Sequence, residues 1–298
     1  MNKRTLAILA AVGATTIYGL NHTIAKGVMP DYVQPFGFIM LRVIGAAILF
    51  WIISVFGPKE KIEKKDYLRM VVCAILGMGI NMLVFFKGLA LSTPINSAVL
   101  ITITPIIVLA LSALLIKEKI IPQKLVGIGI GFLGALGLIL FGAEIRQDAP
   151  NIPLGNFLIL MNAIFYGSYL IVAKTLIAKY HPFTFMKWLF TLGIIFCLPF
   201  GYRELVEIEW VNLPFEALWK IAFVVVGTTF CTYLFNIFAL TQLKASTLSA
   251  FVYVQPLIGI VFAIATGQDV LTTVKIVAAC LVLFGVYLSS KKPKWGGV

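Results

Sequence analysis

The sequence predicts an all-α integral membrane protein in which ten transmembrane helices form two inverted five-helix repeats. Three observations support this prediction. Hydrophobic residues make up 60% of the 298 residues and charged residues only 12%, whereas soluble domains carry roughly 25% charged residues. The apolar residues gather in long runs, and the second half of the chain repeats the pattern of the first. A soluble chain of this length could not hide so much apolar surface from water, so lipid must surround most of it.

Each apolar run is long enough to cross a bilayer, which takes about 20 residues of helix. The expected spans cover residues 5–25, 35–56, 68–87, 93–116, 122–141, 154–174, 182–200, 217–238, 245–266 and 271–289. The linkers are short, so neighbouring helices run antiparallel. Most Lys and Arg residues outside the spans fall on the side of the N-terminus, and we therefore expect both termini to be cytoplasmic.

The basic residues and the cysteines indicate what the chain does not bind. The net charge of +12 would favour a nucleic-acid partner in a soluble protein. Here the basic residues lie in short connections between apolar runs, which fits lipid headgroups, so we expect the bilayer as partner and no nucleic acid. The four cysteines, Cys73, Cys197, Cys231 and Cys280, lie inside apolar runs without CxxC spacing. We expect buried free thiols and neither a metal nor a cofactor.

The two halves, residues 1–148 and 149–298, resemble each other at offsets of 147 to 151 residues. The pattern Tyr-Gly-x5-Ala-Lys at 18–26 returns at 166–174, and Pro105 has a counterpart in Pro256. Each half holds an odd number of spans, so the second half must insert upside down relative to the first. Secondary transporters use such inverted repeats, with the solute near the midplane between the halves. The alternative is two bundles fused for stability.

This layout resembles the EamA-type permeases of the drug/metabolite transporter superfamily over essentially the whole chain. The stretch "YGLN" at 18–21 is similar to the family's aromatic-Gly-x-Asn in the first helix, and Arg42 stands where the second helix often carries Arg. Thr104 and Pro105, followed by Glu118, are similar to its fourth-helix Pro and helix-end Glu. The resemblance implies export or exchange of amino acids, other small metabolites or drugs across the bacterial inner membrane, and it selects no substrate.

The chain departs from the family pattern at three positions. His22 stands where the family commonly has an aromatic residue, and it is the titratable group best placed to sense pH. In the second half, Gln255 and Asp269 replace Thr and Glu.

Polar residues are costly in a bilayer unless they face one another or water, so their helical phase predicts an interior surface. Asn162, Tyr166 and Tyr169 share one face of the sixth span, and Tyr18 and Asn21 are their counterparts in the first. Matching faces recur in spans 3, 4, 8 and 9, which predicts one shared cavity. The candidate solute-binding residues are Tyr18, Asn21, His22, Asn81, Thr102, Asn162, Tyr166, Tyr169, Thr228, Thr232, Tyr233, Tyr253 and Gln255. The alternative is interhelical hydrogen bonding, or packing for the tyrosines.

Two prolines and two cations lie within the expected spans. Pro105 and Pro256 each leave a carbonyl four residues earlier, at Ile101 and Val252, without its usual donor; the resulting kink serves either the solute or packing alone. Arg42 and Lys187 are the cationic groups that lie well inside a span and not at its end. Arg42 could contact an anion, lie beside His22 or extend to the surface.

We expect a secondary transporter and not an enzyme. It would export amino acids or similar neutral, zwitterionic or aromatic solutes by alternating access. No Asp or Glu occupies the middle of a span, which argues against proton-driven export of cationic drugs. The alternatives are an exporter of amphipathic drugs, a membrane-embedded lipid-modifying enzyme, and a receptor or scaffold. The sequence contains no HExxH motif for such an enzyme. The small-residue stretches at 127–137 and 277–285 predict packing within a monomer, with a dimer left open.

Overall fold

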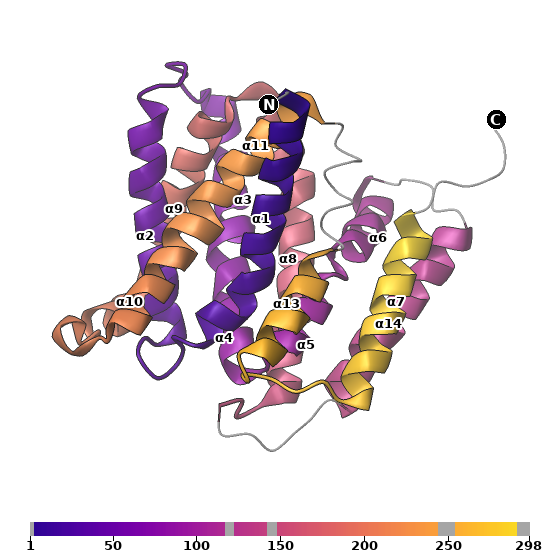
Figure 1. Ribbon diagram of the computed structural model, residues 1–298. Coiled ribbons are helices and arrows are strands. Elements are labelled where there is room, and N and C mark those ends of the chain that lie inside the picture. The colour runs from indigo at the N-terminus through magenta and orange to yellow at the C-terminus, as the bar shows by residue number, and fades with distance from the viewer. Residues whose placement is uncertain (1–2, 117–121, 142–147, 244–253, 291–298) are drawn as a thin grey trace.

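The computed structural model describes residues 3–116, 122–141, 148–243 and 254–290, and in these ranges all regular structure is helical (Figure 1). The first half contains α1 (Lys3–Lys26), α2 (Pro35–Ser54), η1 (Lys64–Asp66), α3 (Tyr67–Ala74), η2 (Ile75–Gly79), α4 (Ile80–Leu91), α5 (Pro94–Ile101), α6 (Thr104–Ile116) and α7 (Pro122–Phe141). The second contains α8 (Ile152–Lys179), α9 (Pro182–Val206), η3 (Trp210–Asn212), α10 (Phe215–Ala222), η4 (Phe223–Cys231), α11 (Thr232–Gln242), α13 (Gln255–Ala265) and α14 (Thr273–Ser290).

The helices follow the predicted spans closely. Eight helical segments of the described chain are long and apolar enough to cross a membrane. Two shorter apolar helices, Gln255–Ala265 and Thr273–Leu288, stand where the ninth and tenth spans are expected. Residues 245–253 of the expected ninth span lie outside the described residues. The all-helical membrane fold is therefore confirmed, and ten crossings stay a prediction.

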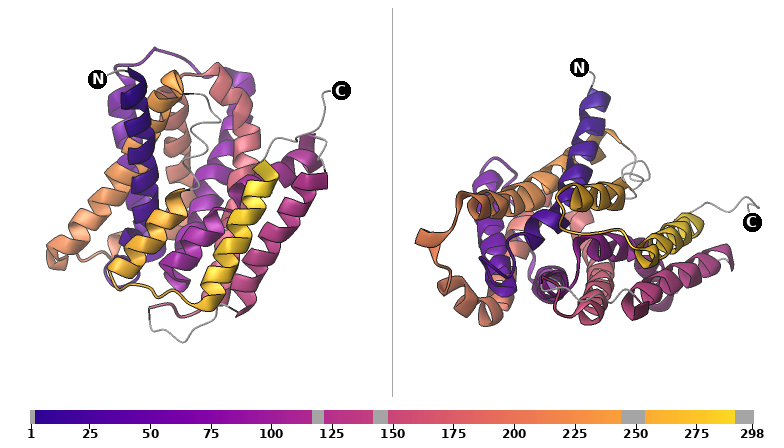
Figure 2. Two further views of the ribbon diagram at one scale, coloured as in Figure 1. Left: turned by 45° about the vertical axis from the view of Figure 1, so that its right-hand side comes forward. Right: turned by 60° about the horizontal axis from the view of Figure 1, so that its bottom comes forward.

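The helices from the two halves of the chain are interleaved in the bundle. Helix α2 packs along α9 and α7 along α14. Helix α4 packs along α8, while α11 packs along α1; likewise α6 contacts α8, and α13 contacts α1. The α4–α8 contact corresponds to the α11–α1 contact, and the α6–α8 contact corresponds to the α13–α1 contact, with the first and second halves exchanged. Figure 2 shows α7 and α14 as a pair at one side of the bundle, and α1 begins at the same end at which α14 finishes (Figure 1).

Glycines allow these helix pairs to approach closely. A Cβ on Gly19 would lie 2.8 Å from the Ile258 side chain of α13. A Cβ on Gly167 would lie 3.4 Å from Ile107 of α6. Gly19 and Gly167 are the glycines of the two repeated Tyr-Gly pairs, and Ile258 and Ile107 also occupy matching positions of the two halves. The repeated glycine thus belongs to one equivalent helix contact in each half, where a larger residue would hold the helices apart.

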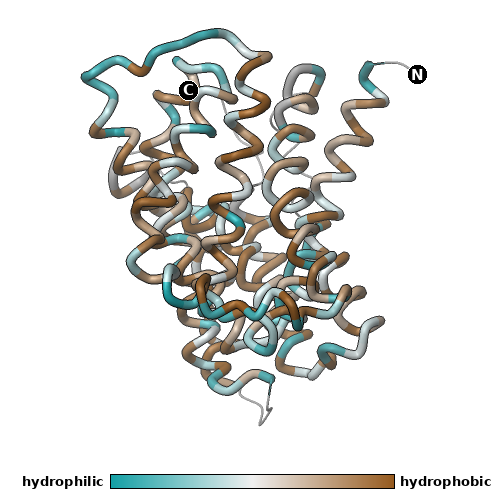
Figure 3. The backbone as a smooth tube through the Cα atoms, turned by 90° about the vertical axis from the view of Figure 1, so that its left-hand side faces the viewer, coloured by the Kyte–Doolittle hydropathy of each residue, from teal (hydrophilic) through white to brown (hydrophobic). Residues whose placement is uncertain are grey.

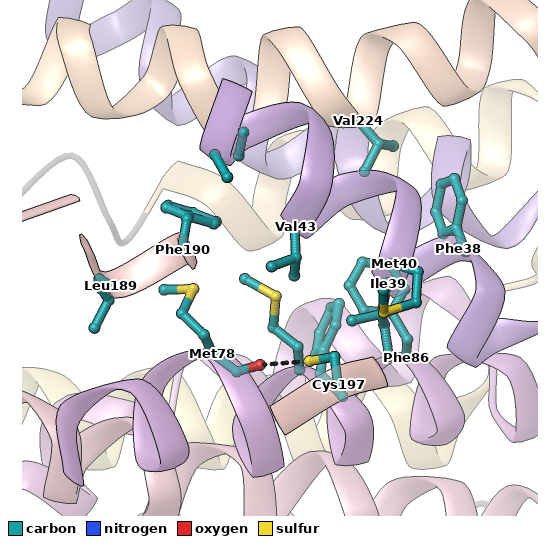
Figure 4. Close-up of a cluster of buried hydrophobic side chains, with 14 of the residues drawn as sticks. Phe38, Ile39, Met40, Val43, Met78, Phe86, Leu189, Phe190, Cys197 and Val224 are labelled. Atoms are coloured by element: carbon teal, nitrogen blue, oxygen red, sulfur yellow. Dashed lines mark hydrogen bonds between the residues drawn. The ribbon is translucent and has the colours of Figure 1, made fainter. Parts of the chain in front are cut away.

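The core between α2, η2, α4 and α9 is built from large apolar side chains. Figure 4 shows Met78 of η2 facing Cys197 of α9, whose Sγ lies 3.6 Å from the Met78 carbonyl oxygen. Phe50 of α2 stacks on Phe190 of α9 with ring centroids 5.5 Å apart. Along the helices the backbone tube is mostly hydrophobic, and the long loop before η1 is hydrophilic (Figure 3).

The prediction of four buried thiols is only partly correct. Cys73 and Cys197 are buried, Cys231 is half-buried and Cys280 is exposed. Helix α14 packs along α7 through one face, so Cys280 lies on its outer face. An apolar run alone does not distinguish a side chain facing lipid from one facing protein.

A buried ion pair ties the segment before α14 to the start of α5. Asp269 Oδ1 lies 2.8 Å from Lys275 Nζ, and both side chains are fully buried. The other oxygen, Oδ2, accepts a hydrogen bond of 3.0 Å from the Ile95 amide. That amide belongs to the first turn of α5, where backbone donors have no partner within the helix. Asp269 therefore joins the two halves at this end of the bundle.

Replacing Asp269 by Asn should destabilise the protein strongly, because Lys275 would keep a buried charge without this carboxylate. Breaking a buried ion pair costs about 3–5 kcal/mol. The melting temperature of the purified protein in detergent measures the loss. Glu207→Gln is the control: it breaks the exposed Arg203–Glu207 pair, which is worth less than about 1 kcal/mol. Equal shifts in the two variants would contradict this account.

Replacing Gly19 by Ala should also lower the melting temperature, because the new Cβ would press on Ile258 and on the Gln255 carbonyl oxygen, 2.9 Å away. Overpacking of this kind costs about 1–3 kcal/mol. The matched control is Gly129→Ala in α7, where a Cβ meets nothing within 4 Å. We expect no loss there, because alanine favours a helix over glycine by about 0.5–1 kcal/mol.

Candidate functional site

Four of the predicted tyrosines meet in the middle of the bundle. Tyr18 of α1, Tyr166 and Tyr169 of α8, and Tyr233 of α11 lie within electrostatic range of one another. The rings of Tyr166 and Tyr169 are 5.7 Å apart between centroids. We call these four residues the tyrosine cluster. Because α1 belongs to the first half and α8 and α11 to the second, both halves build it.

Packing holds two rings of the cluster in place, and three of its four tyrosines are partly exposed. Tyr169 is only 3% exposed, and its ring lies against Gly77, where a Cβ would come within 2.6 Å of Cδ2. The Tyr233 ring packs edge-on against Phe50 at a centroid distance of 6.0 Å. Tyr18 and Tyr233 are half-buried and Tyr166 is 37% exposed. The aromatic faces are thus positioned by packing while part of their surface stays accessible.

Arg42 of α2 lies beside the cluster. Its Nε donates a hydrogen bond of 2.7 Å to Thr229 Oγ1 of η4. Its guanidinium carbon lies 5.4 Å from the centroid of the Phe86 ring. Tyr18 and Tyr233 are within electrostatic range of the guanidinium. The described contacts of Arg42 are thus with neutral side chains, and the side chain is half-buried. An anion contact stays a prediction.

The tyrosine cluster is bordered by two π-helical segments that the sequence did not predict. Segment η2 carries Gly77, and segment η4 carries Thr228 and Thr229. The widened turns leave carbonyls displaced from the usual α-helical ladder, and Thr229 Oγ1 donates to one of them, the Val224 oxygen, at 3.0 Å. Such turns are frequent at functional sites. Both segments contain glycine, Gly77 and Gly79 in η2 and Gly227 in η4, which is a weak signal that could have suggested them.

Several other predicted site residues make contacts between helices. The Asn81 amide donates to the Asn162 carbonyl oxygen, and the Asn162 amide donates to the Asn81 carbonyl oxygen, both at 3.1 Å. This reciprocal pair joins α4 to α8. His22 is 5% exposed, and its Nδ1 lies 2.9 Å from the Ser97 hydroxyl of α5. Its ring packs against Phe85. The sequence did not single out Ser97.

The remaining polar candidates lie close to the backbone. Thr102 donates to the Val99 carbonyl oxygen at 2.5 Å, and Thr232 donates to that of Thr228 at 2.6 Å. Asn21 Oδ1, Asn162 Oδ1 and Thr228 Oγ1 are buried oxygens that have no hydrogen-bond partner among the described residues. Gln255 begins α13 and is half-buried, and Tyr253 lies outside the described residues.

The fourth span is broken at the predicted kink. Helix α5 ends at Ile101, and α6 begins at Thr104 with Pro105 in its first turn. The Ile101 carbonyl oxygen, expected to lack its usual donor, accepts a hydrogen bond of 2.6 Å from the Thr104 hydroxyl. This bond gives the threonine before Pro105 a structural role. Pro256 lies in the first turn of α13, and Val252 falls outside the described residues.

The groups around the tyrosine cluster determine what chemistry this part of the bundle offers. Among the described residues, no three His, Cys, Asp or Glu side chains come close enough to hold a metal ion. The groups gathered at the centre are phenols, one guanidinium and threonine hydroxyls, which bind solutes through hydrogen bonds, aromatic contacts and charge.

Comparisons with known proteins agree with this geometry. The EamA-like transporter family matches twice, over residues 5–140 and 153–291. An uncharacterized transporter of Archaeoglobus fulgidus is 27% identical over 277 residues, covering 93% of this chain and 96% of its own. The uncharacterized transporter YyaM of Bacillus subtilis is 23% identical, with 82% and 81% covered. One solved crystal structure shares the fold, with a TM-score of 0.63 and 14% identity over 96% of this chain and 98% of its own.

The two family matches together span nearly the whole chain, and the relatives are transporters covered over most of their length. With its long apolar helices, this multi-pass membrane chain belongs to the EamA-like transporter family.

Proposed function

We propose that the protein is a secondary transporter that exports small metabolites by alternating access around the tyrosine cluster, with amino acids or similar neutral, zwitterionic or aromatic solutes as the leading class. The observation that carries the proposal is that the cluster is assembled from helices of both halves. Relative movement of the halves would therefore rearrange the cluster and change the side from which it is reached.

The exchanged contacts of the two halves support a rocking movement. Helix α4 packs on α8 as α11 packs on α1, so opening one of these contacts could be matched by closing the other. The break between α5 and α6 supplies a point at which half a helix can bend, as in other transporters with discontinuous helices. These features suit an inverted repeat with its division near residue 148.

The chemistry of the cluster favours solutes with an apolar or aromatic body. The phenol rings offer flat faces and hydroxyl tips, whereas proton-driven export of a cationic drug usually relies on a membrane carboxylate that exchanges a proton for the cation. In the described chain, the carboxylates that form ion pairs lie at or near helix ends and in connecting segments. Amino acids and related metabolites fit this arrangement better than cationic drugs do.

Counterflow in liposomes tests the proposal directly. Purified protein is reconstituted into vesicles loaded with an unlabelled amino acid or amphipathic metabolite, and uptake of the labelled solute is followed. We expect exchange for part of a broad panel. Vesicles that exchange none of the panel would refute this solute class.

Replacing Tyr233 by Phe should weaken exchange by a few-fold to about tenfold, because one hydroxyl hydrogen bond to the solute is lost, worth about 0.5–1.5 kcal/mol. The ring and its packing on Phe50 would remain. Tyr202→Phe, in the last turns of α9 and 61% exposed, is the control and should exchange solute like the wild type. An unchanged Tyr233→Phe protein would remove that hydroxyl from the binding site.

The proposed orientation has both termini in the cytoplasm of a bacterial cell. In a cysteine-free background, Tyr32→Cys in the segment after α1 should react with a membrane-impermeant maleimide added to intact cells. Lys61→Cys, in the segment after α2, should react only after lysis. Both wild-type side chains are exposed, so access depends on the membrane side alone. The reverse labelling pattern would invert the orientation.

A further inference from the structure

We infer that Arg42 binds the carboxylate group of the transported solute, an inference that rests on the proposed function and narrows its substrate class. The observation is a guanidinium inside the helix bundle whose contacts in the described chain are all neutral. They are the Thr229 hydroxyl, the Phe86 ring and the nearby phenols of Tyr18 and Tyr233.

A charge inside a membrane protein is costly unless it is paired, and such residues usually mark solute or ion pathways. In the described chain Arg42 forms no ion pair with a carboxylate. Asp269 is paired with Lys275, Glu204 accepts from the amides of Phe36 and Gly37, and the remaining ion pairs join other residues. Among the described residues the guanidinium therefore has no counter-ion, and a bound solute can supply one.

The terminal nitrogens of Arg42 are available to bind a carboxylate. Its Nε is held by Thr229 at 2.7 Å, which fixes the plane of the guanidinium. The Nη atoms make no hydrogen bond to the described chain and are not sealed from solvent. Two terminal nitrogens of a fixed guanidinium match the two oxygens of a carboxylate.

The charge balance favours a carboxylate over a doubly charged phosphate. Two other cations of the described helices lie over aromatic rings, Lys87 over Phe36 and Lys187 over Trp51. A single guanidinium neutralises one negative charge. If the solute also carries an ammonium, the faces of the tyrosine cluster can accept it through cation–π contacts. The site thus fits an organic monocarboxylate or an amino acid.

Thermal-shift measurements with matched probes test the inference. The probes are 3-phenylpropionate against its amide, and L-leucine against L-leucinamide, because each pair differs at the carboxylate. We expect the carboxylates to raise the melting temperature of the wild type more than the amides do. In Arg42→Gln this preference should vanish, with carboxylate affinity lowered roughly 10- to 100-fold, as expected for a lost charge-assisted hydrogen bond.

Two further variants control the experiment. Arg42→Lys keeps the charge without the planar fork and should retain a weaker carboxylate preference. Lys187→Gln removes another intramembrane cation and should bind like the wild type. The inference is overturned if wild-type protein does not favour the carboxylates, a comparison that needs no variant, or if folded Arg42→Gln keeps the preference.

Counterflow with the same probes separates this inference from the proposed function. If the protein exchanges solutes without preferring carboxylates, the proposed transport stands and the inference about Arg42 is wrong. If it binds carboxylates through Arg42 but exchanges none of them, the binding site stands and the proposed transport is wrong.

Discussion

Lipid offers the backbone no hydrogen-bond partner, and the helix ends and breaks of this protein meet that constraint with side chains from elsewhere in the fold. Glu204 of α9 accepts from two amides at the start of α2, and Asp269 accepts from the start of α5. Both caps reach from the second half to the first. The Thr104 hydroxyl serves the carbonyl freed before Pro105. Because these backbone groups have hydrogen-bond partners, the bundle can hold a broken helix and a charged residue in its interior.

The sequence predicted the features that depend on hydropathy and helical phase, such as where the helices begin and which side chains share a face. The span starting at Pro182 begins at that residue in the structure. Tyr18, Tyr166, Tyr169 and Tyr233 lie within electrostatic range of one another, and a shared solute cavity stays a prediction. It could not predict features set by contacts between distant helices. The π-helical turns depend on packing across η2 and η4. A phase argument places an asparagine on an inner face but cannot tell a solute contact from the hydrogen bonds that join Asn81 to Asn162.

The helices of the two halves make corresponding contacts, but the side chains at these contacts differ. The α4–α8 contact carries two reciprocal amide hydrogen bonds between Asn81 and Asn162, each worth about 0.6 kcal/mol on average in membrane proteins. The repeat offsets place Thr232 and Ala14 at the equivalent positions of the α11–α1 contact, and Thr232 donates within its own helix. Thr232 also contacts Tyr18 of α1 through its hydroxyl, so the two equivalent contacts are held together by different side chains.

The pairing of α7 with α14 also has a consequence for how the chain is assembled during synthesis. The two helices interlock through glycines, with a Cβ on Gly285 meeting the Gly131 backbone at 2.5 Å. Translation delivers α7 well before α14. Until α14 emerges, the side of α7 that packs on it lacks this partner and must be covered by lipid or by the insertion machinery. Truncation before α14 would therefore expose a surface made by the first half, and quality-control proteases could recognise it.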